Sequence, residues 1–168
     1  MKNTKIIAAF PACGKTYYFE NREEDNIVLD SDSSKFSWTY QGRKDENGNL
    51  LRGTEKVRNP EFPNNYIEHI KENIGKVDYI FVSTHDVVRK ALKKANIDFT
   101  IVFPEQSLKA EWIGRCFLRG SGEKFCQMIA DQWDSWILQM EEEVVVNDRE
   151  YYRLKHGEYL SDAMKYFG

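Results

Sequence analysis

Residues 5–16 read KIIAAFPACGKT, and this stretch decides how the rest of the sequence is interpreted. The apolar run that ends at Phe10 predicts a buried strand, and a helix is expected to begin near Gly14. The segment from Ala9 to Thr16 matches the phosphate-binding loop pattern, with Ala9 where the first glycine usually stands. A strand before this motif and a helix after it are the structural context that the motif requires.

The loop residues indicate how a nucleotide would bind. Backbone N–H groups around Gly14 can surround an anionic phosphate, and glycine lets the backbone approach closely. Lys15 is expected to reach the β- and γ-phosphates, and the Thr16 hydroxyl is expected to bind Mg²⁺. The predicted nucleotide-binding residues are Ala12, Cys13, Gly14, Lys15, Thr16 and Tyr17. The alternative is a strand, a turn and a helix that happen to contain a lysine.

Cys13 lies inside this loop and allows two interpretations. The start of a helix stabilises a thiolate, which would lower the pKa of Cys13 and make it reactive. The interpretation that we favour is a small side chain that the loop tolerates.

Strand and helix patterns alternate along the chain, which predicts a parallel sheet with helices on both faces. The fold class is α/β, a three-layer arrangement with a five-stranded, mostly parallel sheet in a single domain, residues 1–168. Residues 144–146 and 151–154 allow a hairpin, or one of them is the last strand. The expected strands are 5–9, 26–30, 79–84 and 99–103, and the expected helices begin near residues 14, 63, 86, 108, 123 and 159.

Composition excludes several function classes. The chain has 168 residues and a net charge of -3, so it has no general attraction for nucleic acid or for an acidic membrane. No apolar run approaches the ~20 residues that a membrane span needs. Three cysteines without a CxxC pair argue against a disulfide framework or a zinc site. We therefore expect a cytoplasmic protein, a monomer or a homodimer, that binds neither membrane nor nucleic acid.

With the GKT motif at residues 14–16, the chain resembles the P-loop kinases of small molecules, the nucleoside monophosphate kinase and shikimate-kinase-like group. It also resembles short nucleotide-kinase-like proteins of bacteriophages, which share runs such as DSDSSKF, residues 30–36 here. The resemblance implies ATP and Mg²⁺, an acceptor-binding insert at residues 31–75 and a lid-like segment at residues 105–124. A phage protein of this kind would work in the host cytoplasm.

The resemblance also implies roles for acidic and basic residues outside the loop. Asp30 would face the metal, and Asp32 would face the acceptor and serve as the general base if the acceptor is a hydroxyl. An Asx turn is the alternative for this pair. Arg115 and Arg119 match the lid, where arginines stabilise the charge of the transferring phosphoryl group. A solvated helix face or ion pairs are the alternative for the two arginines.

The insert supplies further candidates for binding the acceptor. Arg43 and Arg58 could hold an acceptor phosphate, and Trp38 could stack on a base. Each of them alone is also compatible with ordinary loop chemistry. One feature departs from many P-loop proteins, because the strand at 79–84 leads to His85 without an acidic residue. We interpret His85 as a polar residue at a strand end rather than a catalytic base.

These observations favour an ATP-dependent phosphotransferase that moves the γ-phosphoryl group to a nucleoside monophosphate or another small-molecule acceptor. The first alternative is a nucleotide-binding sensor or sequestering protein without transfer activity, which the missing acid after residue 84 supports. The second alternative is a polynucleotide end kinase, which the negative net charge disfavours.

Overall fold

The computed structural model describes residues 1–41, 46–47 and 55–167 of the chain. A parallel sheet forms its centre, with the strand order β2-β5-β1-β6-β7. The strands are β1 (Lys5–Ala9), β2 (Val28–Asp30), β5 (Tyr79–Ser83), β6 (Thr100–Pro104) and β7 (Tyr151–Leu154). The prediction of a five-stranded parallel sheet in an α/β chain is confirmed.

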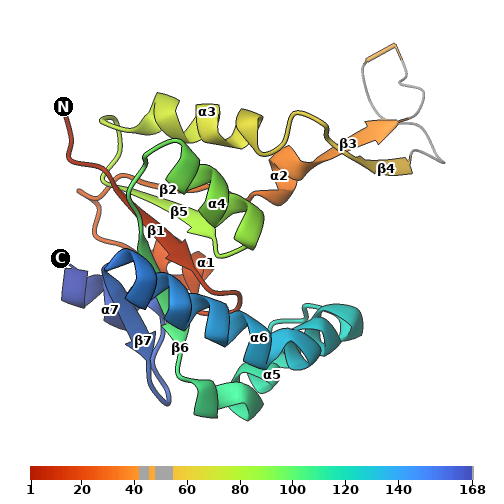
Figure 1. Cartoon of the computed structure of the whole chain (residues 1–168), viewed down its shortest axis with the longest axis vertical. Helices are drawn as coiled ribbons and strands as arrows, with labels where there is room; N and C mark the ends of the chain where they lie inside the picture. Colours follow the sequence, from red (N-terminus) through yellow and green to blue (C-terminus); the bar gives the residue numbers. More distant parts are fainter. Residues whose placement is uncertain (42–45, 48–54, 168) are drawn as a thin grey trace.

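Helices flank the sheet on both sides (Figure 1). The helices are α1 (Lys15–Asn21), α3 (Asn64–Asn73), α4 (Asp86–Lys94), α5 (Lys109–Leu118), α6 (Glu123–Asn147) and α7 (Leu160–Phe167), with a 3-10 turn η1 (Gln106–Leu108) before α5. Contacts join α3 to α4, and an ion pair joins α4 to α6, whereas α1 packs on α7. Right-handed crossovers between these parallel strands place the two groups on opposite faces of the sheet.

A small hairpin lies apart from the main sheet (Figure 1). The short helix α2 (Ser34–Ser37) leads into β3 (Trp38–Gln41), which pairs with β4 (Glu55–Arg58) in antiparallel register. The sequence showed little periodicity in this segment and predicted a long loop or an insert. The described part of the segment contains a helix and two strands, whose antiparallel pairing joins residues that no local periodicity marks.

The C-terminal third resolves the two alternatives that the sequence left open. Residues 144–146 belong to the last turns of α6, so the hairpin prediction is wrong. Residues 151–154 form β7, which pairs in parallel with β6, so the prediction of a last strand there is confirmed. The β-branched run 144–146 favours a strand by local preference, but Val144 is buried in line with the apolar positions of α6.

The apolar runs of the central strands form the core. The residues of β6 and nearly all of β1 are buried, as expected for parallel strands covered on both faces. The chain leaves β1 toward one edge of the sheet and leaves β6 toward the other, so the strand order reverses between these neighbours. Ligands in open α/β sheets bind outside the carboxyl ends of strands at such a point. The loop after β1 lies there.

Candidate functional site

The loop between β1 and α1 has the backbone conformation of an anion-binding turn. Ala12 and Gly14 have positive φ angles of 61° and 96°. The N–H groups of Gly14, Lys15 and Thr16 have no hydrogen-bond acceptor among the described residues. Unpaired N–H groups on successive residues of such a turn form a concave site for an anion. Thr16 and Tyr17 are exposed at the start of α1.

Three hydrogen bonds from distant parts of the chain hold this loop. The Phe10 N–H donates to the Val102 carbonyl of β6 at 2.9 Å. The Trp112 indole of α5 donates to the Pro11 carbonyl at 2.8 Å. The N–H of Leu160, at the start of α7, donates to the carbonyl of the buried Cys13 at 2.7 Å. The conformation of the loop is therefore fixed from three sides.

Cys13 is a buried structural thiol. Its exposed fraction is 1 %. Burial raises the pKa of Cys13 to about 11, although the positive charges of Lys15, Arg115 and Arg119 act in the opposite direction. The thiol stays protonated near neutral pH, which agrees with a tolerated small residue and not with a reactive thiolate. The electrostatic influence of the three cations also shows that they lie near the loop.

Lys15 and Asp30 meet at the carboxyl edge of the sheet. The Lys15 Nζ lies 3.8 Å from the Asp30 Oδ1, although β1 and β2 are separated in the sheet by β5. The Asp30 Oδ1 is buried and has no hydrogen-bond partner among the described residues. An unpaired buried carboxylate oxygen is costly and calls for a cation, a proton or a water molecule. The sequence predicted that both residues belong to one site, and the structure brings them together.

The segment after β2 is anchored on α3. The Tyr66 hydroxyl donates to the Ser31 carbonyl at 2.7 Å, and the Ser31 hydroxyl lies 3.0 Å from the His69 Nε2. Burial, together with the negative charges of Asp32 and Asp30, raises the pKa of Tyr66. The exposed Asp32 accepts a hydrogen bond from the Ser34 N–H at 2.9 Å, which is the Asx turn of the alternative interpretation. Its second carboxylate oxygen is left for other partners.

His85 is the site residue whose importance the sequence did not indicate. It follows β5, which lies between β1 and β2, so it sits between the loop and Asp32. Although His85 is exposed, partial desolvation of its ring is the main cause that lowers its pKa. The positive charges of Lys15, Arg58 and Arg89 lower this pKa further. The negative charge of Asp32 acts against them. These groups therefore surround one imidazole.

Arg115 is near the loop, but its guanidinium is held inside the protein. It stacks on the rings of Trp112 and Tyr159, with its Cζ at 3.9 Å and 4.0 Å from their centroids. Its Nη2 donates to the Glu111 carboxylate at 2.9 Å and to the Glu158 carbonyl at 2.6 Å. Nε and Nη1 are buried and without a partner among the described residues.

Arg119 adopts a different arrangement at the end of α5. Its Nε donates to the Ser121 hydroxyl at 2.7 Å, and its guanidinium lies 5.4 Å from the centre of the Phe125 ring. Arg115 is therefore anchored on Tyr159, which lies against Gly14 of the loop, whereas Arg119 lies at the surface.

The hairpin contributes one pair of the predicted acceptor-binding residues. Trp38 and Arg58 are direct partners across β3 and β4, and the Arg58 guanidinium lies 4.0 Å from the centre of the Trp38 ring. The positive charge of Arg58 also contributes to the lowered pKa of His85. Arg43 lies outside the described residues.

The described residues hold no group of three or more His, Cys, Asp or Glu side chains that could bind a metal ion. Among the same residues, no helix is both long and apolar enough to cross a membrane. Comparisons of the chain with models of protein families, with curated proteins and with solved structures found no match.

Proposed function

We propose that the chain is an ATP-dependent phosphotransferase that acts on a nucleotide, in particular a nucleoside monophosphate, or on another small-molecule acceptor. One observation carries the proposal. The N–H groups of Gly14, Lys15 and Thr16 have no acceptor among the described residues, and they lie at the same carboxyl edge of the sheet as the buried Asp30 Oδ1, which accepts no hydrogen bond there. The N–H groups can donate hydrogen bonds to a polyphosphate, and the carboxylate oxygen can accept a hydrogen bond from a metal-bound water.

The residues present fit a magnesium ion only together with phosphate oxygens. Thr16 and Asp30 would supply one hydroxyl and one carboxylate, which is the sparse protein ligand set that Mg²⁺ uses beside nucleotide phosphates. The ion would neutralise negative charge on the phosphate oxygens. Lys15 would add a point charge there, and its present partner Asp30, at 3.8 Å, is distant enough to release it.

The acceptor would occupy the space between the loop and the hairpin. Arg58 offers a guanidinium that can hold an acceptor phosphate, and Trp38 beside it offers an aromatic face. If the acceptor group is a hydroxyl, Asp32 would receive its proton, because one of its carboxylate oxygens is still free of the turn at Ser34. The chain would act mainly by positioning and electrostatic stabilisation.

A specific observation keeps the sensor alternative as a second candidate. Arg115 is stacked and anchored to Glu111 and Glu158, and β5 is followed by Thr84 and His85 without an acid at the end of the strand. A protein that binds ATP without transferring phosphate would need neither a free lid arginine nor that acid.

Incubation with Mg·ATP and a panel of nucleosides and nucleoside monophosphates separates the two candidates. The proposal predicts ADP formation that depends on one acceptor class. In the Asp32→Asn variant, turnover with a hydroxyl acceptor should fall by at least about tenfold while ATP affinity is retained. Asp25→Asn, a change of an exposed acid outside the site, is the matched control. ATP binding without phosphorylation of any acceptor would support the sensor instead.

A further inference from the structure

The outermost strand β7 has a free backbone edge. Its partner β6 covers one side, and no other strand pairs with it among the residues that the structure describes. The carbonyls of Glu150 and Leu154 accept hydrogen bonds from the β6 side at 3.1 Å and 3.0 Å. Because alternate residues of a strand point their backbone groups in opposite directions, Tyr151 and Arg153 direct theirs to the free edge.

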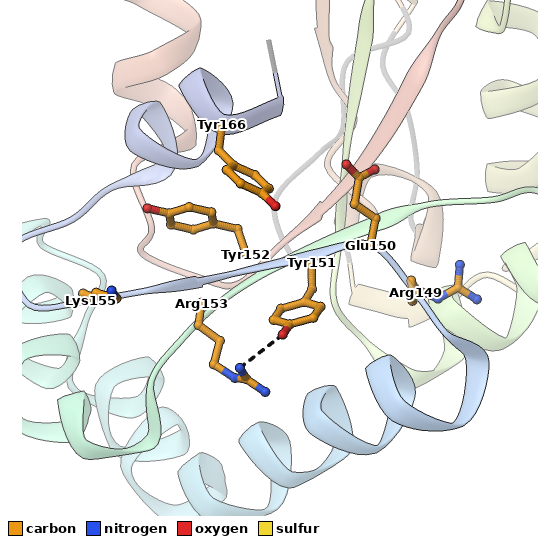
Figure 2. Close-up of a pocket in the computed structure, with 7 residues that line it drawn as sticks. All are labelled: Arg149, Glu150, Tyr151, Tyr152, Arg153, Lys155 and Tyr166. Atoms are coloured by element: carbon orange, nitrogen blue, oxygen red, sulfur yellow. Dashed lines mark hydrogen bonds between the residues drawn. The ribbon is translucent and has the colours of Figure 1, made fainter.

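A groove of about 370 Å³ follows this edge. Figure 2 shows Tyr152 and Tyr166 on one side of the strand and Tyr151 and Arg153 on the other. The two walls of the groove thus belong to opposite faces of the sheet, and the groove itself runs along the free backbone edge of β7. Tyr151 and Tyr166 have exposed fractions of 36 % and 67 %. The groove has the position and the aromatic walls that suit an added strand.

An apolar stripe on α6 borders the same edge. Leu138 and Val145 are 58 % and 76 % exposed and lie three and four residues from Glu141, on one helix face. The Glu141 carboxylate binds the guanidinium of Arg153 in β7 through two hydrogen bonds. The stripe is therefore fixed beside the groove. Exposed aliphatic side chains next to tyrosine and arginine are typical of the centre of a protein interface.

We propose that a second copy of this chain occupies the edge, with its β7 antiparallel to the first and a two-fold axis at Tyr152. Tyr151 then lies opposite Arg153 of the other copy, twice. The chain already shows that this pair is compatible, because the Arg153 guanidinium lies 4.8 Å from the centre of the Tyr151 ring.

Side-chain pairing within β7 favours this register among those that use the same edge groups. A shift by one step in one direction brings Arg153 opposite Arg153, which is unfavourable, and a shift in the other direction removes both Tyr151–Arg153 pairs. In the proposed register the two sheets become continuous, and the stripes of Leu138 and Val145 approach each other across the axis.

Sedimentation velocity and amide hydrogen exchange of the full chain over a concentration series test this proposal. We expect a reversible dimer, and we expect the exchange of the Tyr151 and Arg153 amides to slow as its population rises. No described residue accepts a hydrogen bond from these two N–H groups within one chain, so a contact elsewhere would not protect them. A monomer at every concentration, or a dimer in which both amides exchange freely, would overturn the proposal and leave the edge to another extended partner.

Two variants locate the interface independently. Tyr151→Pro removes an N–H that the chain itself does not use, and Val145→Glu places a charge in the apolar stripe. Each should weaken dimerisation by at least about tenfold. Leu118→Glu, at a leucine that is 91 % exposed on α5, is the matched control and should leave the dimer unchanged. Circular dichroism melting verifies folding, and unchanged dimerisation of a folded Val145→Glu chain would contradict the proposed surface.

Discussion

At the scale of single residues, Gly14 constrains the candidate site most strongly. Its φ angle of 96° is in the left-handed region that side chains with a Cβ avoid. A Cβ built at this position would lie 3.1 Å from the Cδ1 of Tyr159, at the entry to α7. Glycine is needed here both for the turn and for the close approach of the chain segment that covers the loop.

Replacement of this glycine should therefore damage stability and binding together. We expect Gly14→Ala to lower the free energy of unfolding by about 1 kcal/mol or more, because alanine is strained at positive φ. The same change should weaken nucleoside triphosphate binding, since the N–H groups of the loop would shift. Gly114→Ala is the matched control, because Gly114 lies within α5 and a Cβ there would contact nothing within 4 Å. Urea unfolding and calorimetry measure both effects.

Sequence alone was sufficient to predict the residues of the loop and to expect Asp30 beside Lys15. Their positions follow from strand ends, because carboxyl ends of parallel strands meet at one edge. The anchoring of Arg115 between Trp112 and Tyr159 was not predictable in this way. It depends on how α5 and the segment before α7 pack, and no local spacing encodes that contact.

At the scale of elements, the start of α4 carries the titratable group with the clearest consequence. His85 precedes α4, and its pKa in the folded chain is lower than the ordinary value of 6.5. At pH values between the lowered pKa of the folded chain and 6.5, His85 binds more protons in the unfolded chain than in the folded chain. The contribution of His85 therefore lowers stability as the pH falls below about 6.5.

A His85→Asn variant should lose this contribution. We expect its free energy of unfolding to decline less than that of the original chain when the pH is lowered from neutrality through the range of histidine titration. Denaturant unfolding at a series of pH values measures both slopes. Identical slopes for the two chains would show that His85 titrates at its ordinary pKa.

The elements differ in how well the sequence predicts them. Strands such as β6, whose five residues are all buried and include only one polar residue, Thr100, are readily recognised. The β3–β4 hairpin and the end of α6 were missed or ambiguous. In both segments tertiary or cross-strand contacts decide the conformation, and local preference is weak or opposed to it.

At the scale of the whole molecule, a buried ionic cluster joins α4, α6 and the segment before β7. Glu143 is 4 % exposed, and its carboxylate receives Arg89 at 3.3 Å and Lys93 at 2.9 Å. Its other oxygen lies 3.2 Å from the Nε of Arg149, next to β7. One carboxylate thus balances three cations from two parts of the chain, α4 and the segment before β7.

Neutralising this carboxylate should destabilise the whole fold. We expect Glu143→Gln to lower the free energy of unfolding by about 3 kcal/mol, because Arg89 is buried and would keep only the half-exposed Asp86, at 3.6 Å, as a charge partner. Glu142→Gln, at the exposed neighbouring position, should change it by no more than about 0.5 kcal/mol. Urea unfolding provides the comparison, and equal stabilities of the two variants would contradict the assigned role.

The class of the fold was predictable because strand and helix patterns alternate along the chain. The Glu143 cluster was not predictable, since Arg89 and Lys93 lie about fifty residues before Glu143 and no member belongs to a motif. The same holds for the candidate site. Its loop could be predicted from a motif, whereas the neighbours of His85 could not, because they depend on the order of the strands in the sheet.

The proposed function requires that the loop at residues 9–16 bind the phosphates of a nucleoside triphosphate. Isothermal titration calorimetry of the chain with purine and pyrimidine triphosphates, with and without Mg²⁺, measures this binding. We expect magnesium-dependent binding, and we expect Lys15→Ala to weaken it by at least about tenfold through the loss of one charged contact. No magnesium-dependent binding of any triphosphate, or undiminished binding by Lys15→Ala, would contradict the proposed function.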